Sequence, residues 1–367
     1  MEQIYRCNTS GTAVFLIRGL GAERDKAEQE VVEAGVPLPL FHRAVWSAGH
    51  DRSEPWFLLV REEGGRVRAG VAVEQVRTRA MPGHKLLRLR RFGNKLPNDV
   101  CRIILESLGA LVRNSSWILQ IQVQVFSQGR REEFAQMLTE LRYRELVPPS
   151  VYRHTLVLDL KPTEEEIFAK INQTGRQSIR KTEKFSLKSV PLTTPEFADR
   201  IRELQQEALQ RTGGHIASED WRAILNMSKE RPDLSRVFGL FLGEDESPAN
   251  MMAFGWVCSH SDHGEYRAAG STRLSDVKIP YGYIVVWDMI RWAKGVGAEW
   301  FDLGGVTLAE GDEDPLKGIS NFKRHFRGEV AEVGSEWVFD QHPMRAHLAN
   351  VLSRNAQLLL GRMSKKG

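Results

Sequence analysis

The sequence contains little cysteine, and its few thiols are widely separated. Cys7, Cys101 and Cys258 are the only three among 367 residues. An odd number of cysteines without paired spacing excludes a disulfide framework and a Cys-x-x-Cys metal site. We therefore expect the three thiols to be reduced and to lie in the core.

Long hydrophobic runs are also missing. The longest apolar stretches, such as Met251–Cys258, fall well below the roughly 18 residues that a membrane-spanning helix requires. Met1-Glu2-Gln3 contains no basic residue, and the apolar stretch Ala13–Ile17 is too short for a signal peptide. These features predict a protein that stays in the cytoplasm.

Neither sign of charge dominates the chain. It has 51 basic and 47 acidic residues, a net charge of +4 that does not by itself indicate nucleic-acid binding. Apolar residues make up 41% and charged residues 27%, which excludes disordered, collagen-like and coiled-coil proteins. The length predicts about two globular domains.

One order of predicted elements occurs twice along the chain. Each copy has three strands, a helix and a further strand, at 55–60, 66–76, 86–92, 98–112 and 117–125, and again at 236–242, 251–260, 265–269, 281–294 and 300–303. A helix between two strands of one sheet is typical of a parallel pair. The repeat predicts an α/β protein with mixed sheets. This order of elements resembles that of the GNAT acyltransferase fold, and the resemblance implies two tandem GNAT-like domains.

A proline pair, Pro148-Pro149, interrupts the pattern between the two copies. We therefore expect an N-terminal GNAT-like domain over 1–149 and a C-terminal GNAT-like domain over 150–341. A basic amphipathic helix over 342–367 is expected to follow. Its leucines and basic residues fit either a helix that caps a domain or one that rests on an anionic membrane.

A basic segment opens the second half. Arg176, Arg180, Lys184 and Lys188 follow one another at i, i+4 spacing, and Lys181 lies among them. On one helix face, each such pair of like charges costs roughly 0.2 to 0.5 kcal/mol. A bound polyanion would relieve this repulsion, and a solvated basic face is the alternative.

The predicted strand at 300–303 runs into two glycines, Gly304 and Gly305, after Asp302. Glycines at the carboxyl end of a strand let a ligand approach the backbone. A short helix with Phe322, Lys323 and Phe326 follows a polar loop. The two phenylalanines fit core contacts, so Lys323 is expected on another face.

Other chemical motifs are missing from the sequence. It contains no P-loop, no nucleophile elbow and no zinc-protease signature. Cys258, His260, Asp262 and His263 are close in sequence, but they lie on a strand and its turn, where alternation is expected to point them to different faces. The sequence therefore predicts no metal site.

Several motifs between residues 150 and 335 follow one another in a specific order. They are Leu156–Leu160, the basic helix around Ile179-Arg180-Lys181, Glu207–Gly214, Ala269-Gly270-Ser271, Trp292-Ala293-Lys294, Asp302–Gly305 and Gly318 with Asn321-Phe322-Lys323. Their order and spacing resemble the Fem peptidyltransferases. Those enzymes move an amino acid from aminoacyl-tRNA to the stem peptide of a peptidoglycan precursor. The first half resembles the family mainly in its arrangement, with Gly93-Asn94 where members often have Gly-Pro.

The resemblance implies roles for individual residues. Lys323 would be catalytic, Phe322 would lie beside the tRNA acceptor end, and Arg211 would lie near the phosphates of the precursor. The other predicted substrate-binding residues are Asp302, Gly304, Gly305, Arg176, Arg180, Lys181, Lys184 and Arg273. The implied partners are aminoacyl-tRNA and a nucleotide- or lipid-linked peptidoglycan precursor, with contact at the inner membrane surface as a further expectation. The long coiled-coil arm of some members is missing.

The implied reaction is aminolysis of an ester, in which the Lys323 ammonium would stabilise developing negative charge. No residue stands out as a general base. One alternative is a GNAT enzyme that uses acyl-CoA, but the loop Arg273–Gly282 lacks the glycine pattern that binds pyrophosphate, so no cofactor is predicted. The other alternative is a non-catalytic RNA- or envelope-binding protein.

Overall fold

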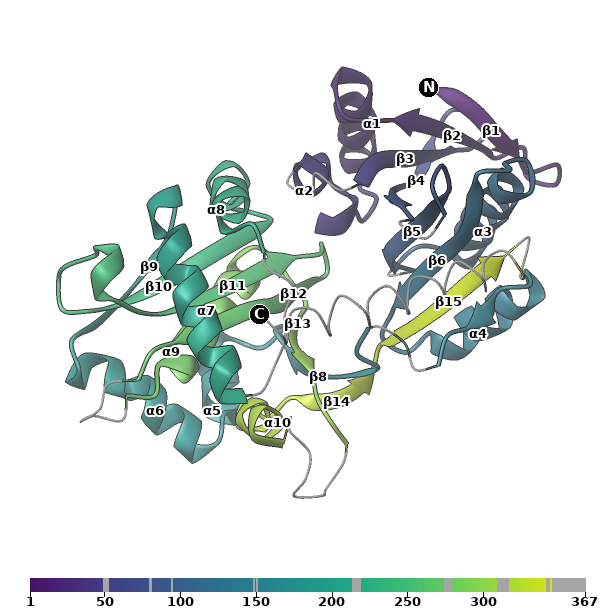
Figure 1. The fold of residues 1–367 in the computed structure, drawn as a ribbon. Helices are drawn as coiled ribbons and strands as arrows, with labels where there is room; N and C mark the ends of the chain where they lie inside the picture. The colour runs from purple at the N-terminus through teal and green to yellow at the C-terminus, as the bar shows by residue number, and fades with distance from the viewer. Residues whose placement is uncertain are drawn as a thin grey trace. The chain divides into compact units, whose positions relative to one another are not determined.

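A computed structural model describes residues 1–48, 53–78, 81–93, 95–147, 149, 151–212, 219–273, 279–308, 317–340 and 344. The chain divides into two compact units. The first comprises Met1–Arg153 and the segment that starts at Val333, and the second comprises His154–Glu332. Each unit is built on one sheet, and Figure 1 shows both sheets with most of their strands labelled.

The first unit has an eight-stranded sheet in the order β1-β2-β3-β4-β5-β6-β15-β7. The strands are β1 (Glu2–Arg6), β2 (Ala13–Arg18), β3 (Ser53–Arg61), β4 (Val67–Arg77), β5 (Lys85–Phe92), β6 (Ile118–Phe126), β7 (Arg144–Glu145) and β15 (Gly334–Asp340). Its helices are α1 (Ala22–Glu33), η1 (Leu40–His42), α2 (Ala44–Ala48), α3 (Asn98–Arg113) and α4 (Arg131–Glu140). The strands β5 and β6 are parallel and α3 connects them.

The four-residue spacing of Val100, Ile104, Leu108 and Val112 explains why α3 packs on this sheet. All four side chains are buried and lie on one helical face, which joins the main core of the unit. Burial of such a face supplies most of the stability of a helix within a domain.

The second unit has a seven-stranded sheet in the order β14-β8-β13-β12-β11-β10-β9. The strands are β8 (His154–Asp159), β9 (Leu187–Pro191), β10 (Ser235–Leu242), β11 (Met251–Ser259), β12 (His263–Ser271), β13 (Trp300–Gly305) and β14 (Glu329–Glu332). The helices are α5 (Glu164–Lys170), α6 (Gln173–Lys184), η2 (Pro195–Phe197), α7 (Ala198–Thr212), α8 (Trp221–Glu230), η3 (Pro248–Asn250), α9 (Tyr281–Gly295) and α10 (Lys317–Arg324). Here α9 connects the parallel strands β12 and β13.

Glycines allow helices to approach both faces of this second sheet. A Cβ atom on Gly255 would lie 2.1 Å from Val285 of α9, and one on Gly270 would lie 2.6 Å from the Leu204 carbonyl oxygen of α7. Gly270 pairs with Phe254 of β11, and Phe254 is followed directly by Gly255. Successive residues of a strand face opposite ways, so Gly270 and Gly255 lie on opposite faces of the sheet. The helices α9 and α7 therefore cover opposite faces (Figure 1).

The predicted repeat of three strands, a helix and a strand is present in both units, so the expected fold class of mixed α/β sheets is confirmed. The expected extent of the second domain, 150–341, differs from the structure at its end. The strand β15 pairs with β6 over seven residue pairs from Gly334 to Asp340, so it completes the first sheet. Periodicity identifies a strand here but not the sheet that it joins.

The predicted terminal helix over 342–367 lies outside the described residues, apart from Met344. Among the described residues, the longest helix is α3, with 16 residues, and no helix has the length and apolarity needed to cross a membrane.

Candidate active site

The parallel strands β12 and β13 pair at their beginnings and then separate. Their register joins His263 to Trp300, Gly264 to Phe301 and Glu265 to Asp302. Beyond this point β12 continues along β11 as far as Ser271, whereas β13 continues along β8. Within the described residues, no backbone pairing joins the carboxyl-terminal parts of β12 and β13. Side chains from other elements can therefore lie between them.

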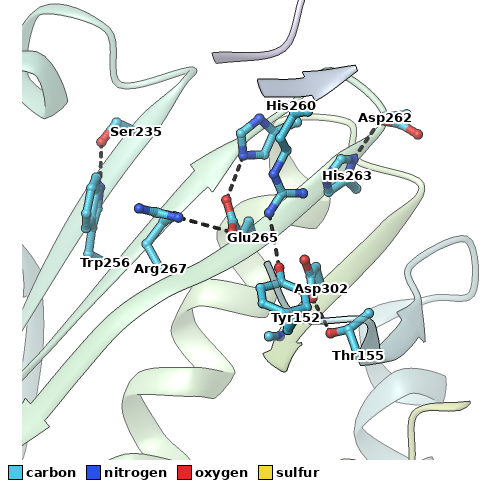
Figure 2. A network of polar contacts seen from close by, with 12 residues as sticks. Tyr152, Thr155, Ser235, Trp256, His260, Asp262, His263, Glu265, Arg267 and Asp302 are labelled. Carbon is cyan, nitrogen blue, oxygen red and sulfur yellow. Dashed lines mark hydrogen bonds and ion pairs between the residues drawn. The ribbon is translucent and has the colours of Figure 1, made fainter. Parts of the chain in front are cut away.

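A bulge in β13 lies where the strands separate. Asp302 pairs with Val157 and Gly305 with Thr155, so three steps on β13 match two on β8. Gly304 has a left-handed backbone with φ of 78°, which glycine adopts without strain. One oxygen of the buried Asp302 carboxylate, Oδ1, accepts hydrogen bonds from the Gly304 N–H at 2.8 Å and from the Thr155 hydroxyl. The second of these bonds is drawn in Figure 2.

Lys323 of α10 extends to this bulge. Its Nζ donates a hydrogen bond to the Gly305 carbonyl oxygen at 2.8 Å and lies 5.6 Å from the centroid of the Tyr266 ring on β12. A Cβ atom on Gly304 would lie 3.2 Å from this Nζ, so the glycine gives the amine room. Lys323 is only 7% exposed, and burial lowers its pKa to about 8, while the charge of Asp302 acts in the opposite direction.

An aromatic cluster attaches α10 to α9. The Phe322 ring lies 4.8 Å from that of Tyr283 and 5.7 Å from that of Phe326, measured between centroids. Tyr283 and His325 share a hydrogen bond between the hydroxyl and Nδ1. Phe326 is fully buried, whereas Phe322 is only half-buried. The two core contacts predicted for this helix are therefore present, and Lys323 points elsewhere, as expected.

Arg211 and Arg273 lie near the far end of β12. Arg211 donates through Nη2 to the Ser271 carbonyl oxygen at 2.6 Å, and its Nη1 lies 3.9 Å from Glu207. Desolvation lowers the pKa of Arg211, and the positive charge of Arg273 lowers it further. Two arginines whose charges repel each other at the end of the strand form a site suited to an anion.

The predicted basic row on α6 is shorter than expected. Arg176 turns back and donates to the carbonyl oxygens of Ala169, at 2.8 Å, and Ile171, so it ties α6 to the end of α5. Arg180, Lys181 and Lys184 are exposed. The extension of the row to Lys188 is wrong, because α6 ends at Lys184 and Lys188 lies on β9, 2.6 Å from Glu246.

In the first unit, protein side chains fill the end of β5, the strand that corresponds to β12 in the repeat. A Cβ atom on Gly93, which follows β5, would lie 2.3 Å from the Phe134 ring. Arg130 Nη1 donates to the Gly93 carbonyl oxygen at 3.0 Å, and its guanidinium stands 5.0 Å from the Phe134 ring centroid. The first unit thus has an arginine and a phenyl ring at the end of β5, whereas the buried lysine of the second unit lies beside the bulge of β13.

A network of buried polar side chains lies at the start of β12 (Figure 2). Glu265 bonds to His260 at 2.9 Å and to Arg267 at 3.3 Å, and Asp262 bonds to His263 at 2.7 Å. The prediction that alternation separates these side chains is wrong for the two histidines, because the turn stacks their rings at 5.0 Å. Within the described residues, no group of three or more acidic, histidine or cysteine side chains is arranged to hold a metal ion.

Sequence reasoning did not identify Thr155 and Tyr266 as part of this site. Both lie on strands, in patterns that fit ordinary core positions, and the bulge that brings Thr155 to Asp302 depends on pairing between distant segments. The pair of glycines after Asp302 is the one local signal of a bulge.

The sequence matches no protein-family model and no curated protein. Solved structures, in contrast, share its fold. The structure of FemX is 12% identical, with a TM-score of 0.74 over 90% of this chain and 98% of FemX. L-PGS from Bacillus licheniformis is 13% identical, with a TM-score of 0.53 over 91% and 98% of the two chains.

A third similar structure is the C-terminal domain of a putative lysylphosphatidylglycerol synthetase from Agrobacterium fabrum. It is 10% identical, with a TM-score of 0.52 over 90% of this chain and 96% of that domain. At these identities the comparisons establish the architecture of the chain rather than its chemistry. The resemblance expected from the sequence motifs is therefore confirmed at the level of fold: this chain shares the fold of FemX.

Proposed function

We propose that this protein is an aminoacyltransferase that moves an amino acid from aminoacyl-tRNA to an amine of a peptidoglycan precursor stem peptide. The observation that carries the proposal is the position of Lys323, whose buried amine lies beside Gly305 where β12 and β13 separate. The motifs shared with the Fem family and the fold shared with FemX support the same reaction class.

The proposed chemistry needs few protein groups. The neutral acceptor amine attacks the ester carbonyl, a C–N bond forms, and the bond to the terminal ribose oxygen of the tRNA breaks. A proton passes from the amine to the leaving ribose oxygen, through a ribose hydroxyl of the substrate itself. With a pKa of about 8, the Lys323 amine is mostly protonated at neutral pH. It donates a hydrogen bond to the oxyanion that forms on the ester carbonyl after the amine attacks and before the ribose oxygen leaves.

The cations around the site suit the polyanionic donor. Arg180, Lys181 and Lys184 are exposed on α6, and Arg211 and Arg273 lie at the end of β12. Cations at such positions attract phosphates and make binding dependent on salt. The half-buried Phe322 would stack on a terminal base of the tRNA, a contact worth about 1 to 3 kcal/mol. The proposal also includes a cytoplasmic location and a peripheral contact of the protein with the inner membrane surface.

The test is incubation of the purified protein with charged total tRNA and nucleotide- or lipid-linked precursors, followed by mass spectrometry of the acceptor. We expect a mass increase equal to one amino-acid residue, which disappears when the tRNA is first treated with ribonuclease. An acetyl-sized increase that requires acyl-CoA would contradict the proposed donor. Salt-sensitive tRNA binding without any product would indicate a non-catalytic RNA-binding protein instead.

Vesicles that contain phosphatidylglycerol belong in the same assay. Two of the similar structures come from L-PGS and from a putative lysylphosphatidylglycerol synthetase, so this lipid is a reasonable competing acceptor. Aminoacylation of the lipid alone would retain the proposed donor and overturn the proposed peptide acceptor.

A further inference from the structure

We propose that Asp302 and Thr155 are positioning residues that place Lys323 by fixing the left-handed bulge at Gly304. Neither side chain needs to touch a substrate. The catalytic consequence of this inference rests on the function proposed above, but the placement of the lysine can be measured without any substrate.

The hydrogen bonds of Asp302 fix the shape of the bulge. The carboxylate oxygen that accepts from the Gly304 N–H, at 2.8 Å, also accepts from the Thr155 hydroxyl of the neighbouring strand. The bond to Gly304 spans only two residues, and the bond to Thr155 joins segments 147 positions apart. One buried carboxylate thus holds a local turn and anchors it to β8.

The bulge in turn determines where the lysine is held. A bulge re-aims the groups that follow it, and here the next group is the Gly305 carbonyl, which accepts from Lys323 Nζ at 2.8 Å. Regular pairing of β13 would point this carbonyl along the ladder toward β8. The left-handed Gly304 also leaves the space that the amine fills, since a Cβ there would lie 3.2 Å from Nζ.

Asp302 also acts on the charge of the lysine. Among the described residues, the titratable groups that face the amine are Asp302 of β13 and Tyr266 of β12. Burial lowers the pKa of Lys323 and raises that of Tyr266 to about 12, so the tyrosine is neutral at physiological pH. Glu265, the register partner of Asp302, is engaged by His260 and Arg267. Asp302 is therefore the carboxylate that opposes the effect of burial on the lysine.

Asp302 is inferred both to fix the bulge and to act on the charge of the lysine. The substitution Asp302→Asn should therefore shift the pKa of Lys323 in the direction opposite to that expected from a purely structural role. Asparagine can still accept from Gly304 and Thr155, but it carries no charge. If the bulge is kept, the pKa of Lys323 falls further below about 8, because only burial then acts on it. If Asp302 merely stabilised the fold, its loss would expose the lysine and its pKa would rise toward the ordinary value.

The experiment is an NMR titration of protein labelled with ¹³C at the lysine Cε, in which the Lys323 signal is assigned by its absence from Lys323→Met. We expect Asp302→Asn to lower the Lys323 midpoint by about one pH unit. The exposed lysines serve as internal controls and should titrate as before. A Lys323 midpoint that stays unchanged or rises would overturn the inference.

Thr155 provides a second and independent pair of variants. Thr155→Ser keeps the hydroxyl that donates to Asp302, whereas Thr155→Val keeps the shape and removes the donor. We expect Thr155→Val to lower kcat of aminoacyl transfer about tenfold, the equivalent of one buried hydrogen bond, with little change in KM for the tRNA. Thr155→Ser should stay within about threefold of the natural protein. Equal rates for the two variants would contradict the positioning role.

The two measurements separate the inference from the proposed function. If the natural protein transfers no amino acid, the titration of Asp302→Asn still decides whether Asp302 places and charges the lysine. If transfer occurs but the Lys323 midpoint does not fall, the positioning role fails and the proposed function stands. If Asp302→Asn does not fold, the rates of the Thr155 pair decide.

Discussion

At the scale of single residues, the site is defined by a lysine that is costly to bury. Lys323 is 7% exposed, and its nearest compensating groups are the Gly305 carbonyl and the Asp302 carboxylate. Burial of a charged amine disfavours the folded state unless partners offset the loss of hydration. A position selected for stability alone would hold an apolar residue, so the lysine indicates a functional constraint.

Lys323→Met is therefore expected to stabilise the protein at neutral pH. The pKa of Lys323 is lowered from 10.5 to about 8, so between these values the unfolded chain holds a proton that the folded chain does not. Stability of the natural protein thus rises with pH across this window, and the full penalty applies below pH 8. We expect a gain of about 1 to 3 kcal/mol at pH 7 that disappears above pH 10.5.

Urea unfolding at pH 7 and pH 10.5 measures this difference, with Lys229→Met on the exposed surface of α8 as the matched control. The control should leave stability within about 0.5 kcal/mol at both values. A loss of stability in Lys323→Met at pH 7 would show that the amine is a net stabilising group.

Gly304→Ala is expected to damage the same bulge by two routes. Its φ of 78° strains any side chain, and the new Cβ would approach Lys323 Nζ to 3.2 Å. We expect a loss of about 1 to 2 kcal/mol in the free energy of unfolding. Gly295→Ala is the control, because a Cβ on this helical glycine has no neighbour within 4 Å and alanine favours the helix. Similar stability changes for both variants would contradict the role of the left-handed turn.

The spacing of motifs along the sequence identified residues that lie together in the structure, and their catalytic and binding roles stay predictions. Phe322, Lys323, Asp302 and the two glycines stand out through their order along the chain, and the structure brings Lys323, Asp302, Gly304 and Gly305 together. Thr155 and the bulge could not be predicted. Their contact is determined by strand register, which the local pattern of β8 does not reveal.

At the scale of elements, α6 and α10 carry the groups that the proposed function assigns to tRNA. The predicted boundaries of the repeated strands and of their crossover helices, at 98–112 and 281–294, agree closely with the structure, because buried apolar faces mark them. The exact end of α6 decides which cations share its surface. Lys184 is exposed on the last turn of α6, whereas Lys188 on β9 is paired with Glu246 at 2.6 Å.

Lys184→Gln and Lys188→Gln therefore form a matched pair of variants. If α6 binds tRNA phosphates, the Lys184 change should weaken tRNA binding and reduce the slope of log K against log salt by about one. The Lys188 change should leave both nearly unaltered, because its charge is already neutralised by Glu246. Filter binding or anisotropy over a range of salt concentrations measures the two slopes, and equal effects would argue against α6 as the tRNA surface.

At the scale of the whole molecule, one architecture occurs twice with different strand ends. In the first unit Phe134 and Arg130 occupy the strand end at Gly93, and in the second the bulge at Gly304 receives Lys323. The repeat itself was predictable because it rests on periodicity. The return of β15 to the first sheet was not, because two mixed sheets offer similar edges to an apolar strand.

The measurement that tests the central claim most directly is single-turnover transfer from isotopically labelled aminoacyl-tRNA by the natural protein, Lys323→Met and Lys229→Met. We predict that Lys323→Met slows the chemical step by about 100- to 1,000-fold while tRNA binding is retained. Lys229→Met should react at the natural rate. Transfer by Lys323→Met at the same rate as the control would contradict the account.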